Sequence, residues 1–198
     1  MPKTTRTFVA LPIPDPIVGK LTRLRESLVD RIAGIRWVDP SHSHVTLNFL
    51  GDVVDTDLHL IGRAVGSVAA RSAAFDVGLR GIGAFPDPRR PRVLWAGIQD
   101  GHDALATLHR ELARELAAVG YHSEEPKFHP HVTLGRIKPD RGASLDLTPL
   151  IKSNRAWSGG TFRARDLVVF ASTLGPGGPV YSPLSRASLR GRIHGPNA

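Results

Sequence analysis

The feature that most constrains this chain is a repeated tetrapeptide, His-Val-Thr-Leu, which occurs at residues 44–47 and again at residues 131–134. In a β-strand, successive side chains point to opposite faces, so the histidine and threonine of each copy share one face while the valine and leucine share the other. Each copy therefore predicts a strand that presents an imidazole and a hydroxyl side by side and is anchored in a core by its other face. We expect two halves of the chain that carry one copy each.

The likeness of the two segments extends beyond the four repeated letters. Each copy has a second histidine two positions before it, His42 and His129, and a proline close by. The first copy continues into the apolar stretch Asn48-Phe49-Leu50-Gly51 and the second into Gly135-Arg136-Ile137-Lys138. A tetrapeptide alone can recur by chance, and this wider agreement makes chance a weaker explanation.

Hydrophobic periodicity predicts an α+β protein with two similar halves. Apolar residues three and four positions apart indicate helices over 17–32, 57–70 and 103–119, the first with Asp15 as its N-cap and Pro16 in its first turn. Besides the two repeated segments, runs rich in β-branched and aromatic residues indicate strands over 8–13, 35–38, 75–79, 92–98, 162–173 and 180–189.

The segments between these elements read as loops. A long basic loop is expected over 81–91, and residues 139–158 are expected to form a loop with at most one helical turn. Residues 1–190 are expected to make one bilobal domain and residues 191–198 a disordered tail.

Composition narrows the class of protein. The 198 residues include no cysteine, which excludes disulfides, thiol nucleophiles and cysteine-ligated zinc and fits a reducing compartment. Pro12, Pro14 and Pro16 interrupt the first apolar run, so we expect no signal peptide, no membrane span and a soluble cytoplasmic protein. The formal net charge of +8 favours an anionic, phosphate-bearing partner. A merely solvated basic surface is the alternative.

Paired histidines and threonines suit phosphoryl chemistry. Near neutral pH a histidine can accept or give a proton, so His44 and His131 could serve as base and acid in one turnover. The hydroxyls of Thr46 and Thr133 can donate hydrogen bonds to phosphate oxygens, and Arg136 can add a positive charge. The chain has no carboxylate-rich cluster of the kind that two-metal phosphodiesterases use, so we expect neither a metal nor another cofactor.

Other interpretations of the same residues stay open. The two histidines can be unrelated strand or surface residues, and the threonines can reflect ordinary strand propensity. His42-x-His44 and His129-x-His131 can instead supply four imidazole ligands to zinc, although metal sites usually include a carboxylate. The remaining histidines are expected to be solvated: His59, His102, His109, His122 and His194.

The combination of motifs resembles the two-histidine phosphoesterase superfamily, and most closely the bacterial and archaeal RNA 2′,3′-cyclic phosphodiesterases, also called 2′-5′ RNA ligases. The resemblance is carried by the two His-x-Thr-x motifs, with Phe49-Leu50-Gly51 after the first and Phe128-His129-Pro130 before the second. It extends through the segments 8–11, 92–95, 135–136 and 181–184. His42 lies where the family has no fixed residue, so it receives no role.

The resemblance implies a fold with two pseudo-symmetric antiparallel-sheet lobes, helices outside and a central cleft that receives one His-Thr pair from each lobe. It implies hydrolysis of a terminal 2′,3′-cyclic phosphate, on RNA 3′ ends or nucleotides, to a 2′-phosphate, with 2′-5′ joining as a reverse reaction and no metal or nucleotide cofactor. His131 would be the base and His44 the acid, or the reverse. Thr46, Thr133 and Arg136 would hold the phosphate and offset charge that grows in the transition state.

The resemblance also suggests contacts farther from the phosphate. Lys127 and the arginines of the loop 81–92 would contact the RNA backbone, and Phe49 or Tyr181 would stack on a base. The protein would act as a monomer. A function of another class, left open by the sequence, is a module that binds such RNA ends without turning them over.

Overall fold

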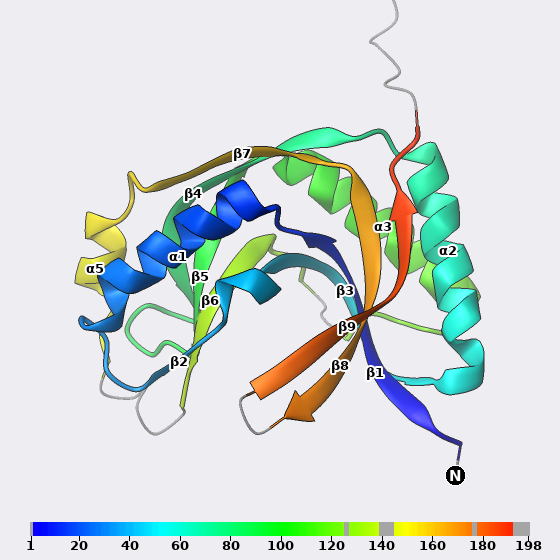
Figure 1. The fold of residues 1–198 in the computed structure, drawn as a ribbon, viewed down its shortest axis with the longest axis horizontal. Coiled ribbons are helices and arrows are strands. Elements are labelled where there is room, and N and C mark those ends of the chain that lie inside the picture. The colour runs from blue at the N-terminus through cyan, green and yellow to red at the C-terminus, as the bar shows by residue number, and fades with distance from the viewer. Residues whose placement is uncertain (1, 125–126, 139–144, 176–177, 192–198) are drawn as a thin grey trace, which may run out of the picture.

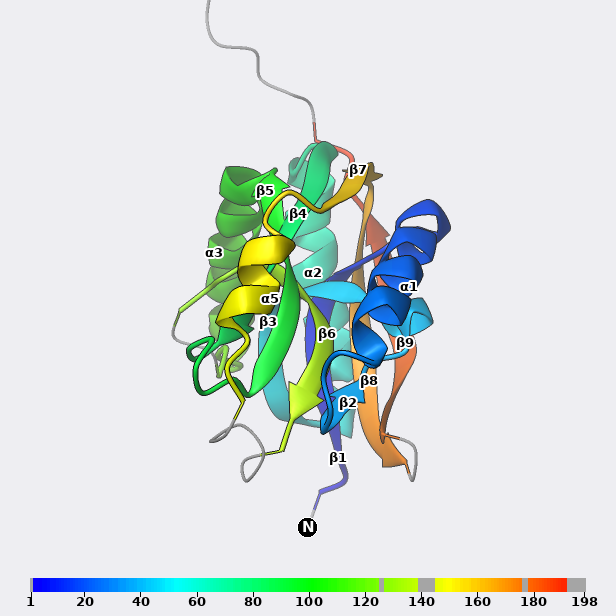
Figure 2. The same ribbon diagram turned by 90° about the vertical axis from the view of Figure 1, so that its left-hand side faces the viewer.

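The computed structural model describes residues 2–124, 127–138, 145–175 and 178–191, and Figures 1 and 2 show it from two directions. Within these ranges, nine strands form one antiparallel sheet in the order β7-β4-β5-β6-β3-β1-β8-β9, with β2 paired to β6. The strands are β1 (Thr4–Pro12), β2 (Ile35–Trp37), β3 (His44–Val54), β4 (Phe75–Phe85), β5 (Val93–Asp100), β6 (His131–Ile137), β7 (Ser158–Ala164), β8 (Asp166–Gly175) and β9 (Gly178–Ser188).

The sheet consists of two four-stranded halves that meet between β3 and β6. One half is β7-β4-β5-β6 and the other is β3-β1-β8-β9. At the junction, Val45 of β3 pairs with Val132 of β6. The predicted α+β fold with two similar lobes is therefore confirmed, but the lobes share one continuous sheet and are not two separate sheets.

Helices cover the sheet and bury one continuous hydrophobic core. They are α1 (Asp15–Val29), α2 (Leu58–Arg71), α3 (His102–Ala118) and the short α5 (Thr148–Ser153), with 3-10 turns η1 (Pro40–His42) and η2 (Asp55–Asp57). Helices α2 and α3 pack together, α2 against β8 and β9 and α3 against β3, while α1 packs on β7 and α5 on β4 (Figure 1). None of the described helices combines the length and the apolar character that a membrane span requires.

The three long helices lie where the periodicity predicts them, with a correction at the first N-terminus. The residues of α1 that the pattern turns inward, Ile17, Leu21, Leu24 and Leu28, are buried. The cap of α1, however, is Pro14, and Asp15 is the first helical residue. Pro14 has an extended backbone and Pro16 fits the first turn, so the helix begins without a side-chain cap.

Two strand predictions are wrong in extent. The expected strand over 162–173 is two strands, because β7 pairs with β4 at one edge of the sheet and β8 pairs with β1 in the other half. The expected loop over 81–91 is shorter, because β4 continues to Phe85 alongside β5. Of the loop expected over 139–158, residues 139–144 lie outside the described residues, and the predicted helical turn is α5. The expected tail lies outside them from residue 192 onward.

Candidate active site

The two repeated motifs lie side by side at the centre of the sheet. Strands β3 and β6 are antiparallel, and Val45 opposite Val132 fixes their register. This register sets His44 across from Thr133 and Thr46 across from His131. Both valines are fully buried, so the two histidines and two threonines lie on the opposite face of the sheet. The two histidines and two threonines that the sequence selected are thus brought together at one junction.

Each motif strand contains an irregularity at the same place. In β3 the register to β1 slips between Thr46 and Asn48, which leaves Leu47 as the extra residue. In β6 the register to β5 slips between Thr133 and Gly135, which leaves Leu134 as the extra residue. A bulge changes which residues share a face beyond it. The side chains five residues after each histidine, Phe49 and Arg136, therefore join the His-Thr face, whereas strict alternation would put them on the other face.

A backbone carbonyl orients each imidazole. The Nδ1–H of His44 donates to the carbonyl oxygen of His42 at 2.8 Å, and that of His131 donates to the carbonyl oxygen of His129 at 2.7 Å. A carbonyl oxygen can only accept, so in the neutral ring the proton is on Nδ1. Nε2 is then the nitrogen of each ring that can take or give a proton. The histidines two positions before each motif thus contribute through their backbone.

The turn that carries the His42 carbonyl is itself fixed. The Asp39 carboxylate accepts hydrogen bonds from the backbone N–H and the hydroxyl of Ser41, at 2.9 and 2.7 Å. These two bonds lower the pKa of Asp39. The turn η1 that follows delivers the His42 carbonyl to the His44 ring.

Aromatic rings surround His44. Phe8, Phe170 and Tyr181 have ring centroids 4.9, 6.1 and 5.1 Å from its own, and Tyr181 meets it edge to face. Burial among these rings, with smaller contributions from the nearby charges of His131 and Arg136, lowers the pKa of His44 to about 4. His44 is therefore neutral at pH 7 in the free protein.

His131 has an aromatic environment of its own in the other lobe. Phe85 meets it edge to face with ring centroids 5.2 Å apart, and Trp95 lies 6.3 Å away. His129 contacts the same two rings at 5.1 and 5.2 Å. Both imidazoles are thus packed on rigid aromatic surfaces, which restrict their orientation.

A cleft of about 470 Å³ opens beside the junction and receives side chains from both lobes. His44, Thr46, Thr133, Arg136 and Tyr181 are among the residues that line it. His131 does not line this cleft itself. It lies two residues before Thr133 on β6, and its charge contributes to the lowering of the pKa of His44. The cleft is therefore shaped to hold an anion against the two threonines with a histidine close by on each strand.

Sequence reasoning missed two arginines of this cleft. Arg25 of α1 and Arg36 of β2 line it. Arg36 pairs with Arg136 across β2 and β6, which concentrates positive charge at one end of the cleft. The pairing of the short strand β2 with β6 gives no local signal in the sequence, so only the assembled sheet identifies Arg36.

Several sequence-selected residues lie away from the cleft. Phe49 packs on Phe8 and is covered by the guanidinium of Arg6 at 4.8 Å from its ring centroid, so it contributes to packing and does not line the cleft. Lys127 is exposed and does not line it either. The same holds for the loop arginines at 89, 90 and 92.

His109 is a further correction, because it is not simply solvated. It stacks on Phe128 at 4.4 Å with an interplanar angle of 5°. Its Nδ1–H also donates to the carbonyl oxygen of Leu47 at 2.8 Å. This hydrogen bond connects α3 to the bulge of β3 at Leu47 and so helps to fix the position of the first motif.

The zinc hypothesis finds no ligand set. Across residues 2–124, 127–138, 145–175 and 178–191, no group of three or more histidine, aspartate or glutamate side chains is arranged to hold a metal ion. His42 and His129 belong to different lobes and each contacts aromatic rings of its own lobe.

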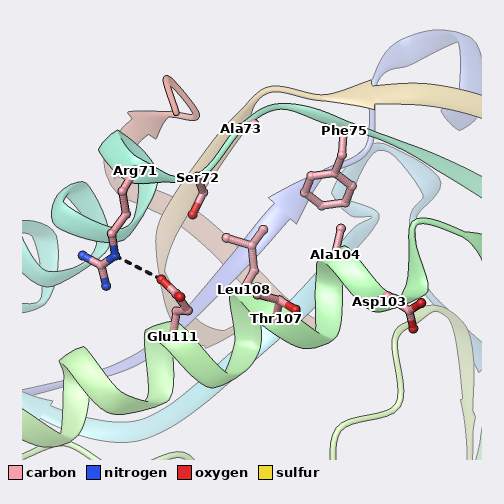
Figure 3. A pocket seen from close by; sticks show the side chains of 9 residues that line it. All are labelled: Arg71, Ser72, Ala73, Phe75, Asp103, Ala104, Thr107, Leu108 and Glu111. Atoms are coloured by element: carbon pink, nitrogen blue, oxygen red, sulfur yellow. Dashed lines mark hydrogen bonds and ion pairs between the residues drawn. The ribbon is translucent and has the colours of Figure 1, made fainter. Parts of the chain in front are cut away.

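A separate hollow, shown in Figure 3, lies between the end of α2, the start of β4 and α3. Arg71 crosses its rim to Glu111 at 3.0 Å and also reaches Glu115 at 2.9 Å. These ion pairs hold α2 against α3. The hollow contains none of the motif residues, and it is a feature of helix packing.

Comparison with known proteins agrees with this geometry. Residues 13–175 match the 2′-5′ RNA ligase superfamily. The RNA 2′,3′-cyclic phosphodiesterase of Aeropyrum pernix is 35% identical over 179 residues, which cover 89% of this chain and 100% of that protein. The protein of the same name from Aquifex aeolicus is 32% identical over 191 residues, 96% of this chain and 100% of the relative.

Solved structures share the fold. TT0787 of Thermus thermophilus has a TM-score of 0.77 and 28% identity over 94% of this chain and 98% of its own. E. coli LigT complexed with 3′-AMP has a TM-score of 0.76 and 24% identity over 94% and 99% of the two chains, a likeness that concerns the fold alone. With a match over most of its length and relatives above 30% identity, this chain belongs to the 2′-5′ RNA ligase superfamily.

Proposed function

We propose that this protein is an RNA 2′,3′-cyclic phosphodiesterase, which hydrolyses a terminal 2′,3′-cyclic phosphate to a 2′-phosphate. Relatives that it matches over their whole length carry this name. The observation that supports the proposal most is the meeting of two His-Thr pairs on one face of the β3–β6 junction, beside a cleft with arginine at one end. Its chemistry needs no group beyond these side chains and water.

The two histidines are suited to act on opposite sides of one phosphorus atom. In an in-line displacement, the attacking water loses a proton on one side while the departing O3′ gains one on the other. The Nε2 atoms of His44 and His131 can perform these two transfers, because each Nδ1 is engaged with a backbone carbonyl. Reversal of the reaction would exchange the two roles.

The low pKa of His44 bears on which histidine takes which role. A base must be unprotonated when the substrate arrives, and with a pKa of about 4 His44 meets this condition at pH 7. We therefore assign the base to His44 and the acid to His131, which is the second of the two assignments that the sequence left open.

Hydroxyls and guanidinium groups hold the phosphate in this proposal. Thr46 and Thr133 would donate to the non-bridging oxygens from the two lobes, and Arg136 would offset the charge that grows on them. Tyr181, which packs on His44 and lines the cleft, would contact the terminal nucleoside. Because one chain supplies both His-Thr pairs, we infer that the protein works as a monomer, and because its substrate is RNA, in the cytoplasm.

Phosphorus NMR of the reaction on 2′,3′-cyclic AMP tests the proposal. We expect the cyclic phosphate signal to be replaced by that of a 2′-phosphate. Release of the 3′-phosphate would contradict the proposed regiochemistry. Tight binding of cyclic-phosphate RNA ends that remain intact after long incubation would instead favour a binding module.

A further inference from the structure

A second hollow lies one strand away from His131. Strand β5 runs next to β6, with Gly97 opposite His131 and Trp95 opposite Thr133. Residues opposite one another in antiparallel strands share a face, so Trp95 and Gly97 lie on the same face of the sheet as the His-Thr pairs. Both residues line a hollow of about 460 Å³ that also includes His129. The indole of Trp95 thus belongs to the wall of this hollow and also packs near the His131 ring, with 6.3 Å between the ring centroids.

This basic hollow has three cations on its wall. Arg80 of β4, Lys152 of α5 and Arg155 just after α5 line it, and no acidic residue does. All three residues are exposed, and none of them forms an ion pair with a carboxylate among the residues that the structure describes. Three cations without carboxylate partners around one concave surface favour a ligand with more than one phosphate group.

The basic hollow also offers aromatic surface. The ring centroids of Trp95 and His129 lie 5.2 Å apart on its wall. The indole can occupy this position only because Gly83 lies next to it, since a Cβ at Gly83 would collide with the ring. Aromatic rings beside cations suit single-stranded RNA, because bases stack on the rings while the cations follow the backbone.

The bonding within a ribose 2′,3′-cyclic phosphate relates the basic hollow to the cleft. In the proposed reaction His131 gives its proton to O3′, so O3′ lies on the His131 side of phosphorus. C3′, which carries O3′, is bonded to C4′, and C4′ bears the C5′ branch that leads to the preceding nucleotide. The base is attached at C1′, which is bonded to C2′ at the other end of this edge of the ring. A terminal base beside Tyr181 in the cleft is therefore compatible with a 5′ branch that runs past His131 toward the basic hollow.

We propose that the basic hollow binds the part of the RNA that precedes the terminal nucleotide, with Lys152, Arg155 and Arg80 on its backbone phosphates and Trp95 against a base. This inference rests on the proposed function and adds the means by which the protein distinguishes an RNA end from a cyclic mononucleotide. 2′,3′-Cyclic AMP has no 5′-phosphate and no preceding nucleotide, so it reaches no part of the hollow. An RNA end gains binding energy from both.

The test compares two substrates that differ only in what precedes the terminal nucleoside. One is 2′,3′-cyclic AMP and the other is a trinucleotide that ends in the same adenosine 2′,3′-cyclic phosphate. We expect the wild-type kcat/KM to be higher for the trinucleotide. In Lys152→Ala/Arg155→Ala the ratio of the two kcat/KM values should fall at least about tenfold, as expected for two lost phosphate contacts. The control Arg110→Ala/Arg114→Ala removes the same charge from exposed positions of α3 outside both the hollow and the cleft, and should leave the ratio unchanged.

The salt dependence of binding separates a phosphate contact from a change in packing. Fluorescence anisotropy of a labelled trinucleotide with a 2′-phosphate end, which is the reaction product, measures Kd without turnover. Each phosphate contact to a single strand contributes about 0.7 to the slope of log Kd against log salt concentration. The slope of Lys152→Ala/Arg155→Ala should therefore be less steep than that of the control by about 1.4. Equal slopes would show that the two cations do not contact phosphates and would overturn the proposal.

The remaining outcomes distinguish this site from the proposed function. An unchanged ratio in Lys152→Ala/Arg155→Ala, or an equal loss on both substrates, would overturn the RNA site and leave the hydrolysis in place. If the wild-type protein hydrolyses neither substrate, the proposed function fails. The anisotropy measurement then still decides whether the basic hollow binds RNA, because it requires no reaction.

Discussion

Val45 of β3 lies directly opposite Val132 of β6, and through this pair the two halves of the sheet are joined. Because both valines are fully buried, the residues on either side of each are turned to the opposite face. The repeat in the sequence thus corresponds to an approximate twofold relationship in the structure, with the pair near its axis. Each imidazole faces the threonine of the other copy.

Removal of either imidazole should abolish most of the activity. Histidine acid–base catalysis typically contributes about 10²–10⁴-fold in rate, so we expect kcat on 2′,3′-cyclic AMP to fall by that order in His44→Ala and in His131→Ala. The control His59→Ala alters an exposed histidine on α2 and should keep the wild-type rate. Full activity in either motif variant would rule out the acid–base pair.

The hydroxyl groups of Thr46 and Thr133 should contribute to kcat as hydrogen-bond donors, apart from any contribution of the side-chain volume to packing. Thr→Val keeps the volume but removes the donor to the phosphate, and loss of one such donor costs about 10²–10³-fold in kcat. Thr→Ser keeps the donor and should retain most of the rate. Steady-state kinetics of the four variants check this, and equal losses in the Val and Ser variants would assign the threonines to packing alone.

The pH dependence of kcat/KM should report the lowered pKa of His44. Because kcat/KM reports the ionisation of the free enzyme, we expect its acidic limb at a pKa of about 4. In Arg136→Gln a positive charge that lowers this pKa is lost, so the limb should move toward higher pH. A wild-type limb at 6.5 or above would contradict the lowered pKa of His44.

The same burial predicts acid sensitivity of the fold. The pKa of His44 is about 4 in the folded protein against 6.5 for a free imidazole, so between these pH values the unfolded chain binds a proton that the folded protein does not. The free energy of unfolding should therefore fall as the pH drops from 6.5 to 4, by up to about 3 kcal/mol from this group. In His44→Asn this contribution disappears. Urea unfolding of both proteins at pH 7 and pH 4.5 measures the difference, and identical pH dependence would contradict it.

Gly51 should resist substitution because of its backbone conformation. Its φ is +65°, in the left-handed region, whereas the Glu124 carboxylate that a Cβ there would meet is the end of a flexible side chain and can move away. We expect Gly51→Ala to lower the melting temperature, with about 1–2 kcal/mol lost to the left-handed backbone. The variant Gly51→Ala/Glu124→Ala should recover little of this loss, because the Glu124 side chain can already move away in Gly51→Ala. Gly66→Ala serves as the control, since α2 has open space there and alanine should stabilise the helix.

Much of the site could be predicted from the sequence because the repeat marks it. Alternation within a strand is a local property, so the amino-acid sequence was enough to assign His44 to the same face as Thr46, and His131 to that of Thr133. The long helices follow from apolar spacing for the same reason. The continuous strand predicted over 162–173 was wrong, because the chain crosses between the two halves of the sheet at Arg165, and pairing partners so far apart in sequence leave no local pattern.

Other features of the site depend on pairing between strands and on irregularities within them, which the sequence does not reveal. The bulges at Leu47 and Leu134 reverse the alternation, and this brings both Arg136 and Phe49 to the face of the two histidines, where Phe49 packs on Phe8. Arg36 joins the cleft through the pairing of β2 with β6, and Trp95 reaches His129 from a neighbouring strand. The amino-acid sequence alone was enough to select the two histidines and two threonines as candidates, since their spacing along one strand groups them on one face. Their common environment, including the low pKa of His44, depends on register and burial, and these exist only when distant segments pack together.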